Sequence, residues 1–127
     1  MLRSRGDIEA DADCVWRLLV DVARWPEWGP SVQAVECPSR VIGPGVTGRV
    51  QTAPGLWLDF EITHWEEGRY WRWRVGGVAA TGHRVVVRGP GRCELVFEVP
   101  AWAPFYLPVC ALALRRIARI ASSRRPA

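Results

Sequence analysis

The 127-residue sequence contains no lysine: all 17 of its basic residues are arginine, and 13 acidic residues bring the net charge to +4. An arginine excess can indicate contact with phosphate or nucleic acid, but acids are interspersed with the arginines along most of this chain.

Long hydrophobic runs are absent too. The longest, residues 101–114, has 14 residues and two prolines, whereas a membrane-spanning helix needs about 20 apolar residues. This segment is therefore too short to span a bilayer.

Paired cysteine motifs are also missing. Cys14, Cys37, Cys93 and Cys110 show no C-x-x-C spacing and no cluster with histidine, so we expect no metal site and no cofactor. Four cysteines would suffice for two disulfides. However, the charged N-terminus lacks the apolar core of a signal peptide, and we therefore expect a cytoplasmic protein with reduced thiols.

The length corresponds to one domain and is too short for a TIM barrel or a complete dinucleotide-binding enzyme. We predict a single domain over residues 1–122 and a basic C-terminal tail over residues 123–127. Five arginines fall within eleven residues near the C-terminus with no acid among them: Arg115, Arg116, Arg119, Arg124 and Arg125. We interpret them as a solvated helix end, where the helix dipole favours cations. The alternatives are contact with a membrane surface or with nucleic acid.

Hydrophobic periodicity divides the chain into helices and strands. Apolar residues recur at helical spacing from Val15 to Val22, and Pro26 disfavours a helical Trp25, so the first helix is expected to end near there, followed by a short second turn. The predicted strands cover residues 2–10, 32–35, 46–52, 56–64, 69–75, 82–88 and 92–99, and a final helix covers 107–122. This order predicts an α+β fold, in which a long C-terminal helix is the only large element that could cover the apolar face of the antiparallel strands.

The segment YWRWR, residues 70–74, resembles a nucleic-acid surface when taken in isolation, with aromatic rings for bases and arginines for phosphates. In a strand, however, its tryptophans and arginines lie on opposite sides of the sheet, whereas a binding platform needs both on one side. Antiparallel pairing places Glu61 near Arg72 or Arg74, and a cross-strand ion pair then explains the arginines. We therefore expect no nucleic-acid partner.

Residues 43–48, GPGVTG, match the G-x-G-x-x-G pattern of dinucleotide sites. Such a site needs a strand before the glycines and a helix after them. Here residues 49–52 continue as a strand, and the chain has no β-α-β unit. We interpret the segment as a connection between strands, in which glycine permits positive φ angles.

Several soft motifs occur in a characteristic order: residues 12–22 with Val15, Trp16 and Asp21, then RWPEW at 24–28, Gly45 and Gly48 before a strand, WRWRV at 71–75, and GHR at 82–84. With the order of elements, they make residues 3–121 resemble the START/Bet v 1-like helix-grip superfamily, in its polyketide cyclase/dehydrase-like group. The resemblance implies a helix-grip fold, in which a curved antiparallel sheet of about seven strands wraps the long C-terminal helix and a deep apolar cavity lies between them. Members bind lipids, hormones or polyketides there, and some catalyse cyclisation, aromatisation or dehydration. No catalytic motif is common to the group, so the resemblance transfers no catalytic residue.

Strand parity predicts which residues would line such a cavity. The inner strand face carries Leu58, Phe60, Ile62, Trp71, Trp73, His83, Val85, Leu95 and Phe97. Tyr106, Cys110 and Leu114 would close the cavity from the helix, and Trp25 and Trp28 would lie near its mouth. The eight tryptophans of the chain could line a flat site for a planar ligand or fill the interior as core.

Polar groups on the inner face are few. His83 is the one titratable side chain on the predicted inner strand face that does not lie at a strand end, so it is a candidate general acid or base. The alternative is a buried neutral histidine that is hydrogen-bonded to a neighbour. Tyr106 could donate to a ligand carbonyl or anchor the helix. His64 has inward parity but lies at a strand end, where we expect it to be exposed. Asp59 and Glu61 point outward, which excludes a paired-carboxylate site, and the serines lie in termini or loops, so no Ser-His-Asp triad is expected.

These features predict a module that binds a small hydrophobic molecule, either aromatic or resembling a polyketide or lipid. A first alternative is a cyclase or aromatase using the same cavity, in which His83 and Tyr106 move or orient protons. A second is a docking module whose arginine-rich C-terminus contacts an acidic partner or a membrane surface, which predicts steep salt dependence. The sequence is consistent with a monomer or a homodimer.

Overall fold

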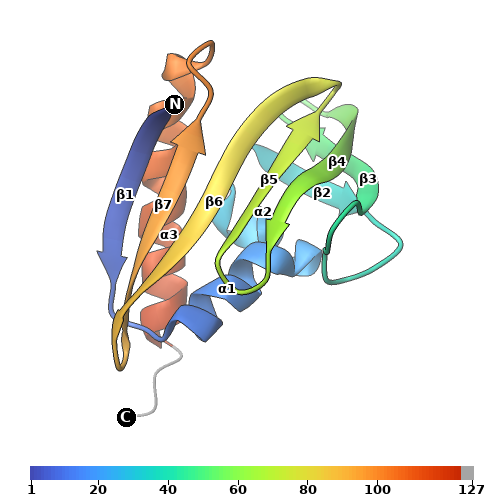
Figure 1. The fold of residues 1–127 in the computed structure, drawn as a ribbon. Helices are drawn as coiled ribbons and strands as arrows, with labels where there is room; N and C mark the ends of the chain where they lie inside the picture. Colours follow the sequence, from blue (N-terminus) through green and yellow to red (C-terminus); the bar gives the residue numbers. More distant parts are fainter. Residues whose placement is uncertain (124–127) are drawn as a thin grey trace.

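Seven strands form a single antiparallel sheet in the computed structural model, which describes residues 1–123 (Figure 1). The elements in chain order are β1 (Leu2–Ile8), α1 (Ala12–Val20), η1 (Val22–Arg24), α2 (Trp25–Trp28), β2 (Val32–Glu36), β3 (Thr47–Thr52), β4 (Leu56–Glu66), β5 (Tyr70–Val75), β6 (Val78–Gly89), β7 (Arg92–Val99), η2 (Pro104–Tyr106) and α3 (Leu107–Ser123). The strand order across the sheet is β1-β7-β6-β5-β4-β3-β2. The predicted fold class is confirmed. Apart from Ser123, the predicted basic tail lies outside the described residues.

The sheet curls around its helices, and the core lies between them. Helix α3 runs behind β1 and β7, while α1 and α2 lie beside it (Figure 1). Val15 and Leu19 of α1, Leu95 and Val99 of β7, and Ile117 of α3 are fully buried. Burying apolar surface of this kind is the main favourable term in folding. No helix within the described residues is long and apolar enough to cross a membrane.

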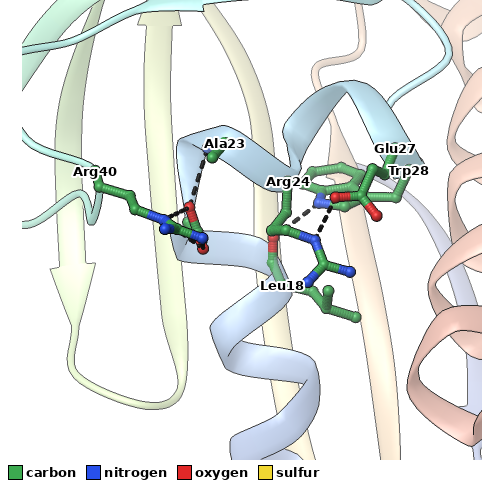
Figure 2. A network of polar contacts seen from close by, with 7 residues as sticks. Leu18, Ala23, Arg24, Glu27, Trp28 and Arg40 are labelled. Carbon is green, nitrogen blue, oxygen red and sulfur yellow. Dashed lines mark hydrogen bonds and ion pairs between the residues drawn. The ribbon is translucent and has the colours of Figure 1, made fainter. Parts of the chain in front are cut away.

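Helix α1 ends at Val20, earlier than predicted, because the loop between β2 and β3 binds the groups at its C-terminal end. The Ile42 N–H donates to the Val20 carbonyl at 3.0 Å. The Asp21 carboxylate accepts from the Ala23 N–H at 3.0 Å and from Nε of Arg40 at 3.0 and 3.1 Å (Figure 2). The chain therefore turns at Asp21 into η1.

Trp25 is helical, with φ −54° and ψ −42°, so the prediction based on Pro26 is wrong at this residue. Pro26 lies in the first turn of α2, where proline is tolerated. Two indole hydrogen bonds hold this turn against α1, both at 2.8 Å. Trp25 Nε1 donates to the Leu19 carbonyl, and Trp28 Nε1 donates to the Leu18 carbonyl (Figure 2). These buried bonds outweigh the steric preference of the residue before proline.

The predicted alternation fails at a β-bulge in β4. The pairing with β5 shifts between Ile62 and His64, and an extra residue in one strand turns the following side chains over. Ile62 is buried and His64 is exposed. The exposure of His64 was expected, but the prediction that its side chain has inward parity is wrong. Trp65 instead turns inward and packs edge-on against Trp16 of α1, with ring centroids 5.4 Å apart.

The outer face of the sheet carries the predicted ion pair and one buried cluster that was not predicted. Arg74 and Glu61 are register partners, with Nη1 3.6 Å from Oε1. Tyr70 and Glu98 are buried on this face, and the phenol donates to the carboxylate at 2.8 Å. Gly82 makes room for them, because a Cβ there would lie 2.7 Å from the phenol oxygen.

Residues 43–48 connect β2 to β3, and the chain continues as strand β3, so a dinucleotide site stays excluded. The expected positive φ occurs at one of the three glycines, Gly45, with φ 71°. Gly48 is needed for a different reason, since a Cβ there would lie 2.6 Å from the Glu36 carbonyl oxygen.

Candidate functional site

A cavity of about 390 Å³ opens at one end of the sheet, between the β5–β6 hairpin, the β3–β4 turn and the segment before α3. Its lining residues are Ser31, Val32, Val50, Thr52, Ala53, Leu58, Trp73, Val75, Val78, Ala79, Ala80, Thr81, Val99, Pro100, Trp102, Ala103, Phe105 and Tyr106. Within the described part of the chain, none of the lining residues carries a charge. The size and composition are those of a small-molecule site.

The mouth of the cavity is apolar as well. Trp102 and Phe105 lie on the segment between β7 and α3, and Val78 lies on the β5–β6 hairpin; their exposed fractions are 59%, 70% and 48%. The Trp102 and Phe105 rings meet edge to face, with centroids 6.4 Å apart. Large apolar side chains exposed together commonly mark a binding surface.

One pair of hydroxyl groups interrupts the apolar wall. Ser31 Oγ and Tyr106 Oη are hydrogen-bonded at 2.5 Å, which joins the start of β2 to the turn before α3. Burial raises the pKa of Tyr106, and the bond to Ser31 opposes the rise. The phenol therefore stays protonated at neutral pH and can act as a hydrogen-bond donor.

A smaller pocket of about 40 Å³ lies deeper, next to the cavity. We call it the inner pocket. The two share five lining residues, Ser31, Val32, Trp73, Thr81 and Tyr106. The hydroxyl pair and Trp73 therefore stand between the two spaces.

His83 lies in the wall of the inner pocket and is neutral. A carbonyl can only accept, so Nδ1 donates to the Trp71 carbonyl, 3.3 Å away. Nε2 is then an acceptor, and the Thr81 hydroxyl donates to it at 3.1 Å while accepting from Trp73 Nε1 at 3.0 Å. Burial lowers the pKa of His83 to about 3, opposed by the bond to Trp71. Both nitrogens are already bonded within the protein, which matches the alternative of a buried neutral histidine.

Aromatic rings fill the interior beyond the inner pocket. Trp25 stacks on Trp71 with centroids 5.7 Å apart, and Trp71 stacks on His83 at 3.8 Å. Phe60 contacts both Trp25 and Trp73 at 5.6 Å. The tryptophans were predicted either to fill the interior as core or to line a ligand site. In the deep interior they fill the core, and at the end near Trp73 the space is open.

The structure separates the predicted site residues into three groups. Leu58, Trp73 and Tyr106 line the cavity. The inner pocket is lined by Trp28, Trp71, His83, Phe97 and Cys110, together with Trp73 and Tyr106. The remaining six are buried in the core and line neither space: Trp25, Phe60, Ile62, Val85, Leu95 and Leu114. Trp25 and Trp28, both expected near the mouth, are buried, with exposed fractions of 1% and 7%.

Several lining residues were not predicted. Thr81 has the same parity as His83 and lies one residue before the predicted strand, so a longer strand would have included it. Trp102 and Phe105 are large apolar residues between the last predicted strand and the final predicted helix, and such residues outside predicted elements are a detectable signal. No sequence signal identifies Ser31, because its contact with Tyr106 joins residues that are 75 positions apart.

The four cysteines are free. Burial raises the pKa of Cys93 to about 11 and that of Cys110 to about 12, so both thiols stay protonated at neutral pH. Within residues 1–123, no group of three or more His, Cys, Asp or Glu side chains is placed to hold a metal ion.

Comparison with known proteins gives a match over nearly the whole chain. Residues 2–121 match the model of a family described as polyketide cyclase / dehydrase and lipid transport. No curated protein matches the sequence significantly.

Solved structures with a similar fold include three of different origin. A hypothetical protein from Helicobacter pylori has a TM-score of 0.74 at 11% identity, covering 94% of this chain and 86% of that one. Norcoclaurine synthase from Thalictrum flavum, in complex with dopamine and hydroxybenzaldehyde, has a TM-score of 0.64 at 13% identity, covering 99% and 88%. DynU16, a putative protein of the dynemicin biosynthetic locus, has a TM-score of 0.67 at 21% identity, covering 98% and 48%. At these identities the likeness shows the fold alone, and it confirms the helix-grip architecture.

Proposed function

The chain belongs to the polyketide cyclase / dehydrase and lipid transport family, and we propose that it binds a small, uncharged hydrophobic molecule in the cavity between the sheet and the segment before α3. The ligand class is aromatic or resembles a polyketide or lipid. The cavity of about 390 Å³ carries the proposal, because its wall is apolar apart from a few hydroxyl groups. A charged ligand would lose its hydration there without gaining an ion pair.

The direct test is native mass spectrometry of the purified protein with a panel of planar aromatic and acyl compounds. We expect one molecule bound per chain, released on denaturation, and weaker binding of carboxylates than of neutral compounds of similar shape. Absence of any bound compound across the panel would contradict the proposal.

Filling the cavity is expected to remove this binding. Leu58 lies in the cavity wall and is partly buried, so Leu58→Trp places a larger side chain into open space without overpacking the core. We expect the affinity of a bound panel compound to fall at least about tenfold, since the ligand and the indole compete for one volume.

Leu56→Trp is the matched control. Leu56 lies two residues away on the same strand face, is 58% exposed and is not part of the cavity lining. The same substitution there should leave affinity nearly unchanged. Equal losses in both variants would show that the compound binds elsewhere.

The hydroxyl pair supports a second proposal, a cyclase or aromatase activity in the same cavity. Tyr106 can donate to a substrate carbonyl, which makes that carbon more electrophilic toward an enol carbon of the same molecule. As the new carbon–carbon bond forms, the carbonyl π bond breaks and its oxygen gains the proton that the enol oxygen loses. The resulting hydroxyl group then leaves as water with a hydrogen from the neighbouring carbon. His83 would act indirectly in this case, because its Nε2 faces Thr81. Its role would be to orient Thr81 in the wall shared by the cavity and the inner pocket.

Turnover of a linear aryl triketone to its cyclised, dehydrated product tests this second proposal. Removing one preorganised donor to a developing oxyanion costs about a hundredfold in rate, so Tyr106→Phe should lower turnover by that factor while the triketone still binds. If the unsubstituted protein converts the triketone no faster than buffer does, the cyclase proposal is contradicted and only the binding proposal stands.

A further inference from the structure

One buried indole N–H in the tryptophan cluster has no acceptor. Among the described residues, Trp25, Trp28 and Trp73 donate to acceptors 2.8 to 3.0 Å away. Trp71 Nε1 is buried and has no hydrogen-bond partner, although the residue is 1% exposed. Buried donors are nearly always paired, because an unpaired one loses its hydration without compensation.

Trp71 lies in the wall of the inner pocket. The polar groups around it are already bonded to one another. The Trp71 carbonyl accepts from His83, Nε2 of His83 accepts from Thr81, and the Thr81 hydroxyl accepts from Trp73. These three acceptors are engaged with other donors, so none of them pairs with the Trp71 N–H, and this donor remains unused within the protein.

The inner pocket has room for an oxygen atom but not for a whole ligand. Its volume of about 40 Å³ exceeds the roughly 10–15 Å³ that one water molecule requires, and it is about a tenth of the 390 Å³ of the cavity. The cavity of about 390 Å³ begins on the other side of the shared residues Ser31, Trp73 and Tyr106. Because the two spaces adjoin at these residues, a small polar group is the only part of a ligand in the cavity that the inner pocket could hold.

We propose that the inner pocket is the polar end of the binding site, where Trp71 Nε1 donates a hydrogen bond to the carbonyl oxygen of an uncharged ligand. This inference rests on the proposed function, since the body of the ligand lies in the cavity. It names the ligand class as neutral ketones or related carbonyl compounds with a flat apolar body. Carboxylates fit less well, because the residues that line either space, all within the described chain, include no lysine or arginine.

A pair of probes isolates the carbonyl oxygen. Acetylnaphthalene and isopropenylnaphthalene have nearly the same shape, but the second has a methylene group where the first has oxygen. The ratio of their affinities reports the hydrogen bond and is insensitive to general changes in cavity shape. We expect Trp71→Phe to shift this ratio about tenfold against the ketone, the effect of losing one buried hydrogen bond.

Trp25→Phe is the control variant, because Trp25 stacks on Trp71 but donates to the Leu19 carbonyl. It should leave the ratio unchanged. An unchanged ratio in Trp71→Phe would overturn the inference while leaving the binding function intact. If neither probe binds the unsubstituted protein and the wider panel also fails, the binding function itself is contradicted and the inference falls with it.

A second measurement needs no substitution that could disturb folding. In the unsubstituted protein with isotope-labelled tryptophan, saturating acetylnaphthalene should move the indole proton resonance of Trp71 downfield, while isopropenylnaphthalene should not. Equal shifts with both probes, or none with the ketone, would overturn the inference.

Discussion

Replacing Gly48 by alanine is expected to lower the free energy of unfolding by about 3 kcal/mol, the upper end of the usual range for overpacking. A Cβ at this position would lie 2.6 Å from the Glu36 carbonyl oxygen and 2.8 Å from two ring carbons of Phe60. Neither can move away easily. The first is backbone, and the Phe60 ring is 2% exposed and held between Trp25 and Trp73.

Urea unfolding followed by far-UV circular dichroism measures this loss, with Gly43→Ala as the control. Gly43 lies five residues earlier in the same connection and has no positive φ, and a Cβ added there would have no neighbouring atom within 4 Å. We expect this variant to unfold at nearly the same urea concentration as the unsubstituted protein. Similar losses in the two variants would mean that the effect arises from the backbone of the connection and not from contact with Phe60.

The second large effect is a dependence of stability on pH that arises from His83. Its pKa is about 3 in the folded protein against an ordinary value of 6.5, so between these values the unfolded chain binds a proton that the folded chain does not. Stability is therefore fully present above pH 6.5 and is lost as the pH falls toward 3. The slope approaches about 1.4 kcal/mol per pH unit once the unfolded histidine is protonated.

Unfolding free energies measured at pH 7, 6, 5 and 4 for the unsubstituted protein and for His83→Gln isolate this contribution from that of the carboxylates. The variant should lose less stability as the pH falls from 7 to 4. The difference in unfolding free energy between the two proteins should grow with a slope that corresponds to about one proton, or about 1.4 kcal/mol per pH unit. His64→Gln controls for the removal of a histidine, because His64 is exposed. Parallel curves for the unsubstituted protein and His83→Gln would contradict the assignment.

The sheet and its helices were predictable because their signals are local. Alternation of residue types in β5 and β7 and helical spacing in α1 and α3 each mark an apolar face that packs on the core, and the residues themselves specify that face. The errors occur where distant groups decide the local structure. Trp25 is helical because its indole binds a carbonyl of α1, and the parity of His64 changes at a bulge set by pairing with β5.

The candidate site was harder to predict than the fold. Parity identified which residues point inward, such as Phe60 and Leu95, but it does not tell a packed interior from an open one. That distinction depends on how α2 places Trp25 against the sheet, and hence on the contacts of its ring with Phe60 and Trp71. The cavity consequently lies nearer the sheet end than expected, with Leu58 and Tyr106 in its wall.

The position of β1 has a consequence for the order in which the chain acquires its structure. Its partner is β7, with Leu2 opposite Val99 and Ile8 opposite Cys93. During synthesis the first strand therefore has no partner until nearly the whole domain has left the ribosome, and closing so long a loop costs chain entropy before any contact compensates for it. Every second residue from Arg3 to Asp7 is exposed and charged, and the charges are of both signs. Charged side chains of this kind protect an unpaired strand from aggregation.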